Sequence, residues 1–250
     1  MRRIIPLMNL SFLSESVTGL VSLIWPPHCL ICQAPLGSET DQMTCVTCLA
    51  SMPKNPQPWC PTCGLSLLGW GKETTHCVAC LQKPSPLTWA RAATLYQGTA
   101  KASVGKLKFH HQVNLADPMA RAMAEVAQTP PTFNADLLIP VPLHTTRERQ
   151  RGFNQSALLA DALSPQLKIP VAKEILIRSV ATEAQTKLNA TGRRQNVLNA
   201  FKVSNPVAIQ NKHLLLIDDV MTTGSTLFGC AEVLALAGAK TIGALAFARG

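Results

Sequence analysis

The sequence predicts an α/β protein with a largely parallel sheet flanked by helices, preceded by a small cysteine-rich domain. Two observations support this prediction. Eight of the nine cysteines form four Cys-x-x-Cys pairs within the first third of the chain. From residue 87 onward, short apolar stretches alternate with stretches of helical periodicity. Such alternation is typical of strands and helices arranged around a parallel sheet.

Composition excludes several classes of protein. Hydrophobic residues make up 47% of the 250 residues and charged residues 15%, which is typical of a globular chain and not of a disordered one. No apolar run is long enough to span a bilayer. The apolar stretch after Arg2 and Arg3 is interrupted by polar residues and lacks a cleavage site, so it does not predict a signal peptide. We expect a short amphipathic helix over residues 12–24 instead, packed on the protein's own body.

The formal net charge of +9 favours anionic partners such as phosphates, nucleotides or nucleic acid. Bound metal weakens this argument. A zinc ion held by four thiolates carries a net negative charge, and two such sites would lower the total to about +5.

The cysteine pairs predict two structural zinc sites. Zinc takes four ligands in a tetrahedron, and each Cys-x-x-Cys turn supplies two thiolates from one tight loop. A sequential arrangement of the pairs, which makes a double zinc ribbon, is favoured over an interleaved cross-brace. Iron–sulfur clusters also use four thiolates and stay open as an alternative. Closely spaced thiols of this kind suit a reducing compartment. The predicted ligands are Cys29, Cys32, Cys45, Cys48, Cys60, Cys63, Cys77 and Cys80.

Prolines at 84 and 86 suggest a boundary between an N-terminal domain, residues 1–86, and a C-terminal domain, residues 87–250. The C-terminal domain shows alternating elements. Strands are predicted at 93–96, 137–140, 174–177, 200–203, 213–217 and 241–247, and helices at 99–109, 116–127, 152–163 and 225–237. Ligands of such sheets bind at the carboxyl ends of the strands.

A phosphate site is predicted where the apolar strand 213–217 ends. Asp218 and Asp219 follow the strand, where they can accept hydrogen bonds from ribose hydroxyls and orient magnesium-bound water, and we assign them as the candidate catalytic residues. A loop then opens a helix, and a helix N-terminus attracts phosphate through its free amides and dipole. Glycine allows close approach of the backbone, and hydroxyls add donors. The predicted binding residues of this loop are Thr222, Thr223, Gly224, Ser225 and Thr226.

Two further stretches are candidates for pyrophosphate binding. Arg147, Arg149 and Arg151 follow the strand at 137–140, and guanidinium groups bind the several charges of a pyrophosphate in bidentate fashion. A solvated basic loop is the alternative. The stretch from Arg178 to Val197 contains Arg193 and Arg194 and is interpreted either as a flap over the reaction centre or as a structural arm.

The segment 218–226 resembles the phosphoribosyl-pyrophosphate (PRPP) signature of type I phosphoribosyltransferases. Together with Leu107-Lys108-Phe109, the Arg-Gly-Phe-Asn-Gln stretch at 151–155 and the cysteine pairs, it makes the chain similar to the ComF/GntX-like family from about Cys29 to Arg249. The resemblance implies a cytoplasmic protein with a type I phosphoribosyltransferase-like parallel sheet flanked by helices and a small N-terminal double zinc ribbon. It also implies a link to competence and to the use of imported DNA, with a ComF-type DNA helicase as a partner in some bacteria.

Two functions stay open at this point. One is a phosphoribosyltransferase that binds PRPP with magnesium and transfers the ribose to an acceptor, which the sequence does not identify. The other is a non-enzymatic adaptor of the DNA uptake machinery that binds a nucleotide or single-stranded DNA. Trp25, Trp59 and Trp70 offer faces on which bases could stack, although packing against the ribbons is the more ordinary use of such residues.

Overall fold

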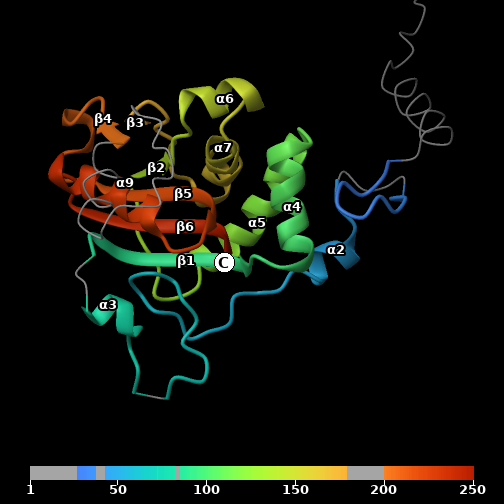
Figure 1. The fold of residues 1–250 in the computed structure, drawn as a ribbon, viewed down its shortest axis with the longest axis horizontal. Coiled ribbons are helices and arrows are strands. Elements are labelled where there is room, and N and C mark those ends of the chain that lie inside the picture. Colours follow the sequence, from blue (N-terminus) through green and yellow to red (C-terminus); the bar gives the residue numbers. More distant parts are fainter. Residues whose placement is uncertain (1–26, 38–42, 72, 83–84, 179–199) are drawn as a thin grey trace, which may run out of the picture.

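The computed structural model describes residues 27–37, 43–71, 73–82, 85–178 and 200–250 (Figure 1). Its main element is a four-stranded parallel sheet in the order β1-β6-β5-β2. These strands are β1 (Leu87–Leu95), β2 (Leu137–Pro140), β5 (His213–Met221) and β6 (Thr241–Arg249). A separate antiparallel pair is formed by β3 (Leu176–Arg178) and β4 (Phe201–Val203). The expected helix over 12–24 and the expected flap residues 185–197 lie outside the described residues.

The described helices connect these strands. They are α2 (Val46–Ala50), α3 (Val78–Gln82), α4 (Gly98–Phe109), α5 (Ala116–Ala127), α6 (Thr145–Arg151), α7 (Gln155–Leu167) and α9 (Ser225–Leu236), with short 3-10 turns at Val113–Leu115 and Val207–Ile209. In the part of the chain that the structure describes, no helix combines the length and apolar character needed to cross a membrane.

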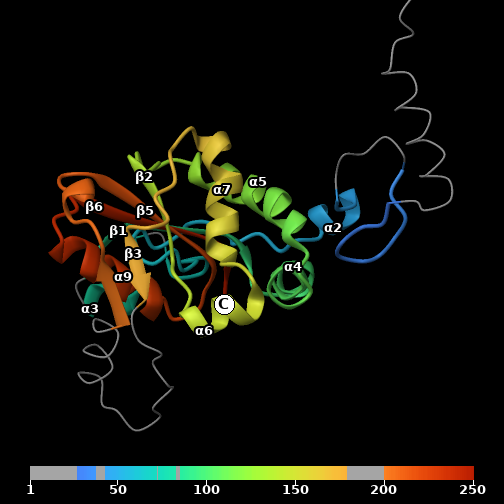
Figure 2. The ribbon, with the colours of Figure 1, turned by 90° about the horizontal axis from the view of Figure 1, so that it is seen from above.

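The sheet is buried on both faces, as its apolar strands predict. Helices α4, α5 and α7 cover one face, and α9 with the β3–β4 pair covers the other (Figures 1 and 2). Successive side chains of a strand point to opposite faces. Accordingly, Leu215 and Ile217 of β5 pack with the first set of helices, whereas Leu214 and Leu216 pack with α9. The predicted parallel sheet flanked by helices is confirmed.

Strands β1 and β5 differ most from the prediction. Strand β1 starts at Leu87 and ends at Leu95, whereas the sequence predicted residues 93–96. Its first half has a single β-branched residue, Thr88, and contains the charged Arg91, so it lacks the β-branched pattern of a strand, and burial decides its conformation. Strand β5 continues to Met221, so Asp218 and Asp219 are part of the strand and do not follow it.

The helix predicted at 152–163 is also wrong in its bounds. Residues 145–151 form the separate helix α6, which ends because Gly152 adopts a left-handed conformation with φ of 80°. Helix α7 then begins at Gln155, where the Asn154 side chain accepts a hydrogen bond from the amide of Ser156, and it runs to Leu167. The three predicted arginines therefore lie on a helix and not in a loop.

The cysteine-rich segment covers the free edge of the sheet. Strand β1 is the outermost strand, and its outer backbone groups pair with the segment between the cysteine groups. The amide of Leu95 donates to the carbonyl of Pro53 at 2.7 Å, and the amide of Ala90 donates to Pro61 at 2.7 Å. An edge covered in this way is protected from pairing with other chains. The domain boundary at residue 86 stays a prediction.

Candidate functional site

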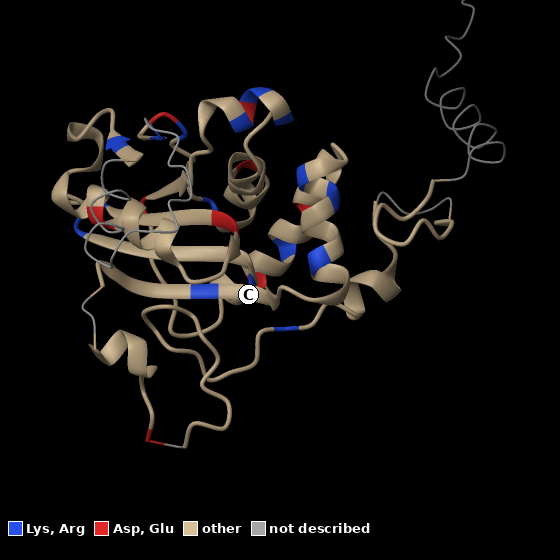
Figure 3. Ribbon diagram, in the orientation of Figure 1, with Lys and Arg blue, Asp and Glu red and all other residues tan. Residues whose placement is uncertain are grey.

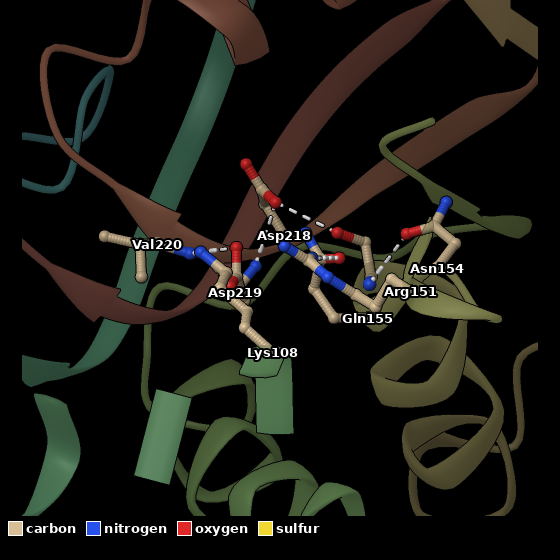
Figure 4. A network of polar contacts seen from close by, with 8 residues as sticks. Lys108, Arg151, Asn154, Gln155, Asp218, Asp219 and Val220 are labelled. Atoms are coloured by element: carbon tan, nitrogen blue, oxygen red, sulfur yellow. Dashed lines mark hydrogen bonds and ion pairs between the residues drawn. The ribbon is translucent and has the colours of Figure 1, made fainter. Parts of the chain in front are cut away.

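The acidic pair lies near the carboxyl end of β5 and is almost fully buried, with 8% of Asp218 and 3% of Asp219 exposed (Figure 4). Asp218 Oδ1 accepts hydrogen bonds from Ser156 Oγ at 3.0 Å and from the amide of Asp219 at 2.9 Å. Asp219 Oδ1 accepts from the amide of Val220, and its Oδ2 forms an ion pair with Lys108 Nζ at 2.5 Å. The end of α4 and the start of α7 therefore both contribute to this site.

Burial raises the pKa of Asp218 to about 8, and the negative charge of Asp219 adds to the rise. Hydrogen bonds from Ser156 and from the Asp219 amide, and the charge of Lys108, offset only part of it. Two adjacent carboxylates share the site unfavourably when both are ionised. The pair consequently favours a state with one proton at neutral pH, and a cation that approached Asp218 would displace that proton.

The loop after β5 is exposed and rich in donors. Its hydroxyl residues Thr222, Thr223, Ser225 and Thr226 are all exposed, and the hydroxyls of Thr223 and Ser225 lie 2.8 Å apart. Gly224 is the N-cap residue of α9 and has no side chain that could cap the helix. The amides of the first turn therefore face the loop, where a helix binds anions best.

Gly224 is required for two reasons. Its φ of 77° is strained for any residue with a side chain, and an added Cβ would lie 2.8 Å from the ring of Phe228. We expect Gly224→Ala to lower the free energy of unfolding by about 1–3 kcal/mol and to weaken anion binding at the loop. Gly105→Ala in α4 is the matched control, because an added Cβ there meets nothing within 4 Å. Thermal unfolding that shows the same stability for both variants would contradict this assignment.

A cluster of cations lies beside the acidic pair. Arg151, at the end of α6, donates to Gln155 Oε1 at 2.5 Å, and its guanidinium carbon lies 5.5 Å from the ring centroid of Phe109 (Figure 4). Burial lowers the pKa of Arg151; the charge of Asp219 opposes this effect, and the charge of Arg147 adds to it. Lysine and arginine are frequent along α4 and α6 (Figure 3).

Arg178, at the end of β3, lies over the ring of Phe201 and is a further cation that Arg147 influences. Burial lowers its pKa, and the charge of Arg147 lowers it further. The charge of Arg147 thus acts on the pKa of both Arg151 and Arg178. Arg149 is two residues from Arg147 on the helix and so lies on a different side of α6. Arg147 and Arg151 are four residues apart on α6 and so share a face of the helix, and the charge of Asp219 acts on Arg151.

Three residues of the site were not predicted from the sequence. Lys108 was noted only as part of a stretch shared with a family, although it pairs with Asp219. Ser156 was not singled out, although it bonds Asp218. Gln155 was noted only within the stretch at 151–155, although it bonds Arg151. A basic residue at the end of a helix is a weak signal by itself, and only the topology shows that α4 ends at β5.

The eight predicted cysteine ligands form two groups of four. In each group the Sγ atoms all lie within 4.8 Å of one another. One group contains Cys29, Cys32, Cys45 and Cys48, and the other contains Cys60, Cys63, Cys77 and Cys80. Each group combines two Cys-x-x-Cys pairs that are consecutive in the sequence. The predicted sequential arrangement is therefore confirmed, and the interleaved cross-brace does not occur.

The charges and hydrogen bonds of both cysteine groups favour the binding of a cation. Burial raises the pKa of Cys29, but hydrogen bonds from backbone amides, including those of Cys45 and Ile31, outweigh it and lower the pKa to about 6. Burial and the charge of Cys60 raise the pKa of Cys63 to about 11, against an opposing backbone hydrogen bond. The thiolate form is thus favoured at Cys29, whereas the Cys63 thiol resists ionisation. Four sulfurs at this spacing fit a tetrahedral zinc ion, which makes all four thiolates favourable.

We expect metal analysis to find close to two zinc ions per chain. Cys32→Ser should remove one ion and Cys80→Ser the other, because each substitution leaves a group with three thiolates. Cys230→Ala is the control, since Cys230 is buried in α9 and belongs to neither group. Recovery of iron, or loss of zinc from the control, would overturn the assignment.

Comparisons with known proteins agree with both parts of the chain. Residues 20–81 match the double zinc ribbon domain, and residues 154–250 match the phosphoribosyl transferase domain. The chain is 35% identical over 227 residues to the DNA utilization protein YhgH of Escherichia coli O157:H7, covering 87% of this chain and 94% of that protein. It is 33% identical over 200 residues to competence protein F of Haemophilus influenzae, covering 77% of this chain and 85% of that protein.

A solved structure also shares part of the fold. It is the glutamine PRPP amidotransferase of B. subtilis complexed with ADP and GMP, 17% identical, with a TM-score of 0.40. The similarity covers 57% of this chain and 30% of that one. At this TM-score the likeness is too low to support a functional argument.

Proposed function

Because this chain belongs to the family of DNA utilization protein YhgH and competence protein F, we propose that its phosphoribosyl transferase domain binds PRPP together with magnesium. The observation that supports this proposal is the position of the buried acidic pair. It lies between an exposed loop of phosphate donors at a helix N-terminus and a cluster of arginine and lysine side chains. A sugar with a phosphate at one end and a pyrophosphate at the other matches this order of charges.

The loop at 222–226 would hold the 5-phosphate of the sugar. Its hydroxyls and the amides of the first turn of α9 are donors that the exposed loop presents to a ligand. Asp218 and Asp219 would accept hydrogen bonds from the ribose hydroxyls. The same carboxylates are the residues that would hold magnesium, which supplies positive charge to the pyrophosphate when it is bound.

The cation cluster would receive the pyrophosphate. The positive charge of Arg147 acts by repulsion on both Arg151 and Arg178. A polyanion relieves that repulsion and can accept bidentate contacts from each guanidinium. Lys108 lies within the same region and could move from Asp219 to the ligand. Arg149 is assigned a weaker contribution, because the helix turns it away from Arg147 and Arg151.

As an enzyme the protein would act by positioning. The bond between the anomeric carbon and the pyrophosphate oxygen breaks with its electron pair leaving on pyrophosphate, while an acceptor nucleophile attacks the carbon. The acidic pair would orient the ribose during this step, and the arginines would stabilise the developing negative charge. The acceptor and the group that takes its proton are not assigned.

Calorimetry with PRPP and magnesium tests the proposed site. We expect wild type to bind and Asp218→Asn/Asp219→Asn to lose at least about a hundredfold in affinity, because several charge-assisted contacts disappear together. Asp161→Asn is the matched control, since Asp161 is an exposed carboxylate on α7 that pairs only with exposed Lys173 among the described residues. Equal binding by wild type and the double variant would refute the site.

A second candidate function is a non-enzymatic adaptor that binds single-stranded DNA. The names of the relatives, DNA utilization and competence, and the net charge of +9 favour it. A ComF-type DNA helicase would be its partner in the cytoplasm, where unbridged thiols stay reduced. The adaptor would bind single-stranded DNA with a steep salt dependence and keep that binding in Asp218→Asn/Asp219→Asn. Release of pyrophosphate from PRPP in the presence of an acceptor would favour the enzyme instead.

A further inference from the structure

The second cysteine group contacts the phosphate loop through Phe228 of α9. The ring of Phe228 packs against the apolar cluster made by three of the four cysteines of this group and Leu67. The same ring lies directly beneath the loop, because a Cβ added at Gly224 would be 2.8 Å from it. One side chain therefore contacts both the second cysteine group and the most constrained residue of the loop.

A second contact lies at the other end of the loop. Gly64 follows the last cysteine of the turn at 60–63, and a Cβ added there would lie 3.3 Å from Met221 Cε and 3.2 Å from the carbonyl oxygen of Ala90. Met221 is the last residue of β5, and the loop starts with the next residue. The cysteine group thus packs against the residues on both sides of the loop, Met221 before it and Phe228 after it.

The first cysteine group has no comparable position in the described structure. Its buried residues Cys29 and Cys48 pack in the other apolar core, together with Trp89 of β1 and residues of α4 and α5. That core lies on the face of the sheet opposite to α9. The two cysteine groups have the same composition, but in the described part of the chain only the second packs against the residues that flank the phosphate loop. The first group therefore serves as an internal control for the second.

We propose that the second cysteine group, with its metal bound, is the rigid base of the phosphate loop, and that Phe228 is the positioning residue that links the two. This inference rests on the function proposed above, since it assigns the loop to ligand binding. Zinc fixes a ribbon that lacks a sufficient apolar core of its own. Metal binding at the second group and ligand binding at the loop are then coupled, and such coupling acts equally in both directions.

Hydrogen exchange tests the structural half of the proposal without any ligand. Cys80→Ser removes a ligand of the second group, and Cys32→Ser removes one of the first. We expect amide exchange in peptides covering residues 221–231 to become faster in Cys80→Ser and to stay near wild type in Cys32→Ser. Equal exchange in the two variants, whether both fast or both slow, would overturn the proposed support.

Phe228→Ala tests the link itself, with Leu236→Ala as the control because Leu236 lies on the same helix and is 80% exposed. We expect Phe228→Ala to keep two zinc ions, to release one of them faster to a chelator, and to bind PRPP about tenfold more weakly. Saturating PRPP with magnesium should slow release of that ion in wild type but not in Phe228→Ala. Phe228→Leu should restore part of both effects, because it keeps an apolar side chain under Gly224.

The two proposals fail in different ways. If wild type binds no PRPP, the proposed function is wrong, while hydrogen exchange and chelator kinetics without ligand still decide whether the second group supports the loop. If wild type binds PRPP and Phe228→Ala matches Leu236→Ala in affinity and in zinc release, the proposed function stands and the coupling is wrong.

Discussion

Asp218→Asn should make the ligand-free protein more stable at pH 8, although it removes a proposed binding residue. Burial and the charge of Asp219 raise the pKa of Asp218 to about 8, so ionising this carboxyl in the folded protein is costly. Asparagine keeps an acceptor oxygen for Ser156 Oγ and for the amide of Asp219, and it carries no charge. We expect a gain of about 2 kcal/mol in the free energy of unfolding, or several degrees in Tm.

The pH dependence of this gain follows from the direction of the pKa shift. A carboxyl whose pKa is higher in the folded than in the unfolded state stabilises the protein at low pH, where it is protonated in both states. That stabilisation is lost as the pH rises from about 4 to about 8. The difference between the variant and wild type should therefore be small near pH 4 and largest at pH 8.

Urea unfolding across this pH range measures the effect. Asp161→Asn, on an exposed carboxylate, should show little change at any pH. An Asp218→Asn variant that is less stable than wild type at pH 8 would show that the folded protein prefers the ionised carboxylate and would contradict the raised pKa.

Ligand should reverse the order of stability. Wild type gains free energy from any ligand that binds only the folded state, and the gain grows with ligand concentration. The variant should gain much less from PRPP with magnesium, so wild type should become the more stable protein in saturating ligand. Two carboxylates held close together for ligand binding are expected to destabilise the ligand-free protein. The bound ligand then stabilises the protein by contacting both of them.

The parts of the site that could be predicted from the sequence are those that are contiguous in it. Asp218, Asp219 and the loop at 222–226 lie within nine consecutive residues, so local chemistry identifies them without knowledge of the fold. Lys108 is far from Asp219 in the sequence and meets it only because α4 ends at the carboxyl edge of the sheet. The role of Phe228 was also not predicted, because an apolar residue on a helix normally indicates only core packing.

Strands that are continuously apolar, such as β2 and β5, were predicted from the sequence. The prediction was wrong for a strand whose composition does not indicate that it is buried. Strand β1 contains three alanines and one arginine among its nine residues, and neither residue type indicates a strand. Its conformation is determined by β6 on one side and the cysteine-rich segment on the other. An arginine within a strand normally indicates an exposed position, yet only 2% of Arg91 is exposed.

The second large effect is expected from substitution of Arg91, which we predict to weaken metal binding at the second cysteine group. The guanidinium carbon of Arg91 lies 4.9 Å from the ring centroid of Trp59 and 5.1 Å from that of Trp89, and the guanidinium donates to the carbonyl of Ala90 at 2.8 Å. Its Nε is buried and has no hydrogen-bond partner among the described residues. Burial lowers the pKa of Arg91, and the negative charge of Cys60 opposes that shift. A buried cation so placed is well suited to balance the negative charge of zinc held by four thiolates.

We therefore expect Arg91→Met to lower the stability of the zinc-loaded protein by about 3 kcal/mol, because the second group loses its buried counter-charge. It should also speed zinc release from that group. After zinc is chelated the effect should shrink or change sign, since the unmodified arginine is then a buried charge without an adequate counter-ion. Lys101→Met is the control, because Lys101 is an exposed cation that also lies over an aromatic ring, that of Tyr96. An equal loss of stability with and without zinc would mean that Arg91 acts only by packing between the two tryptophans, and that its charge does not contribute to metal binding.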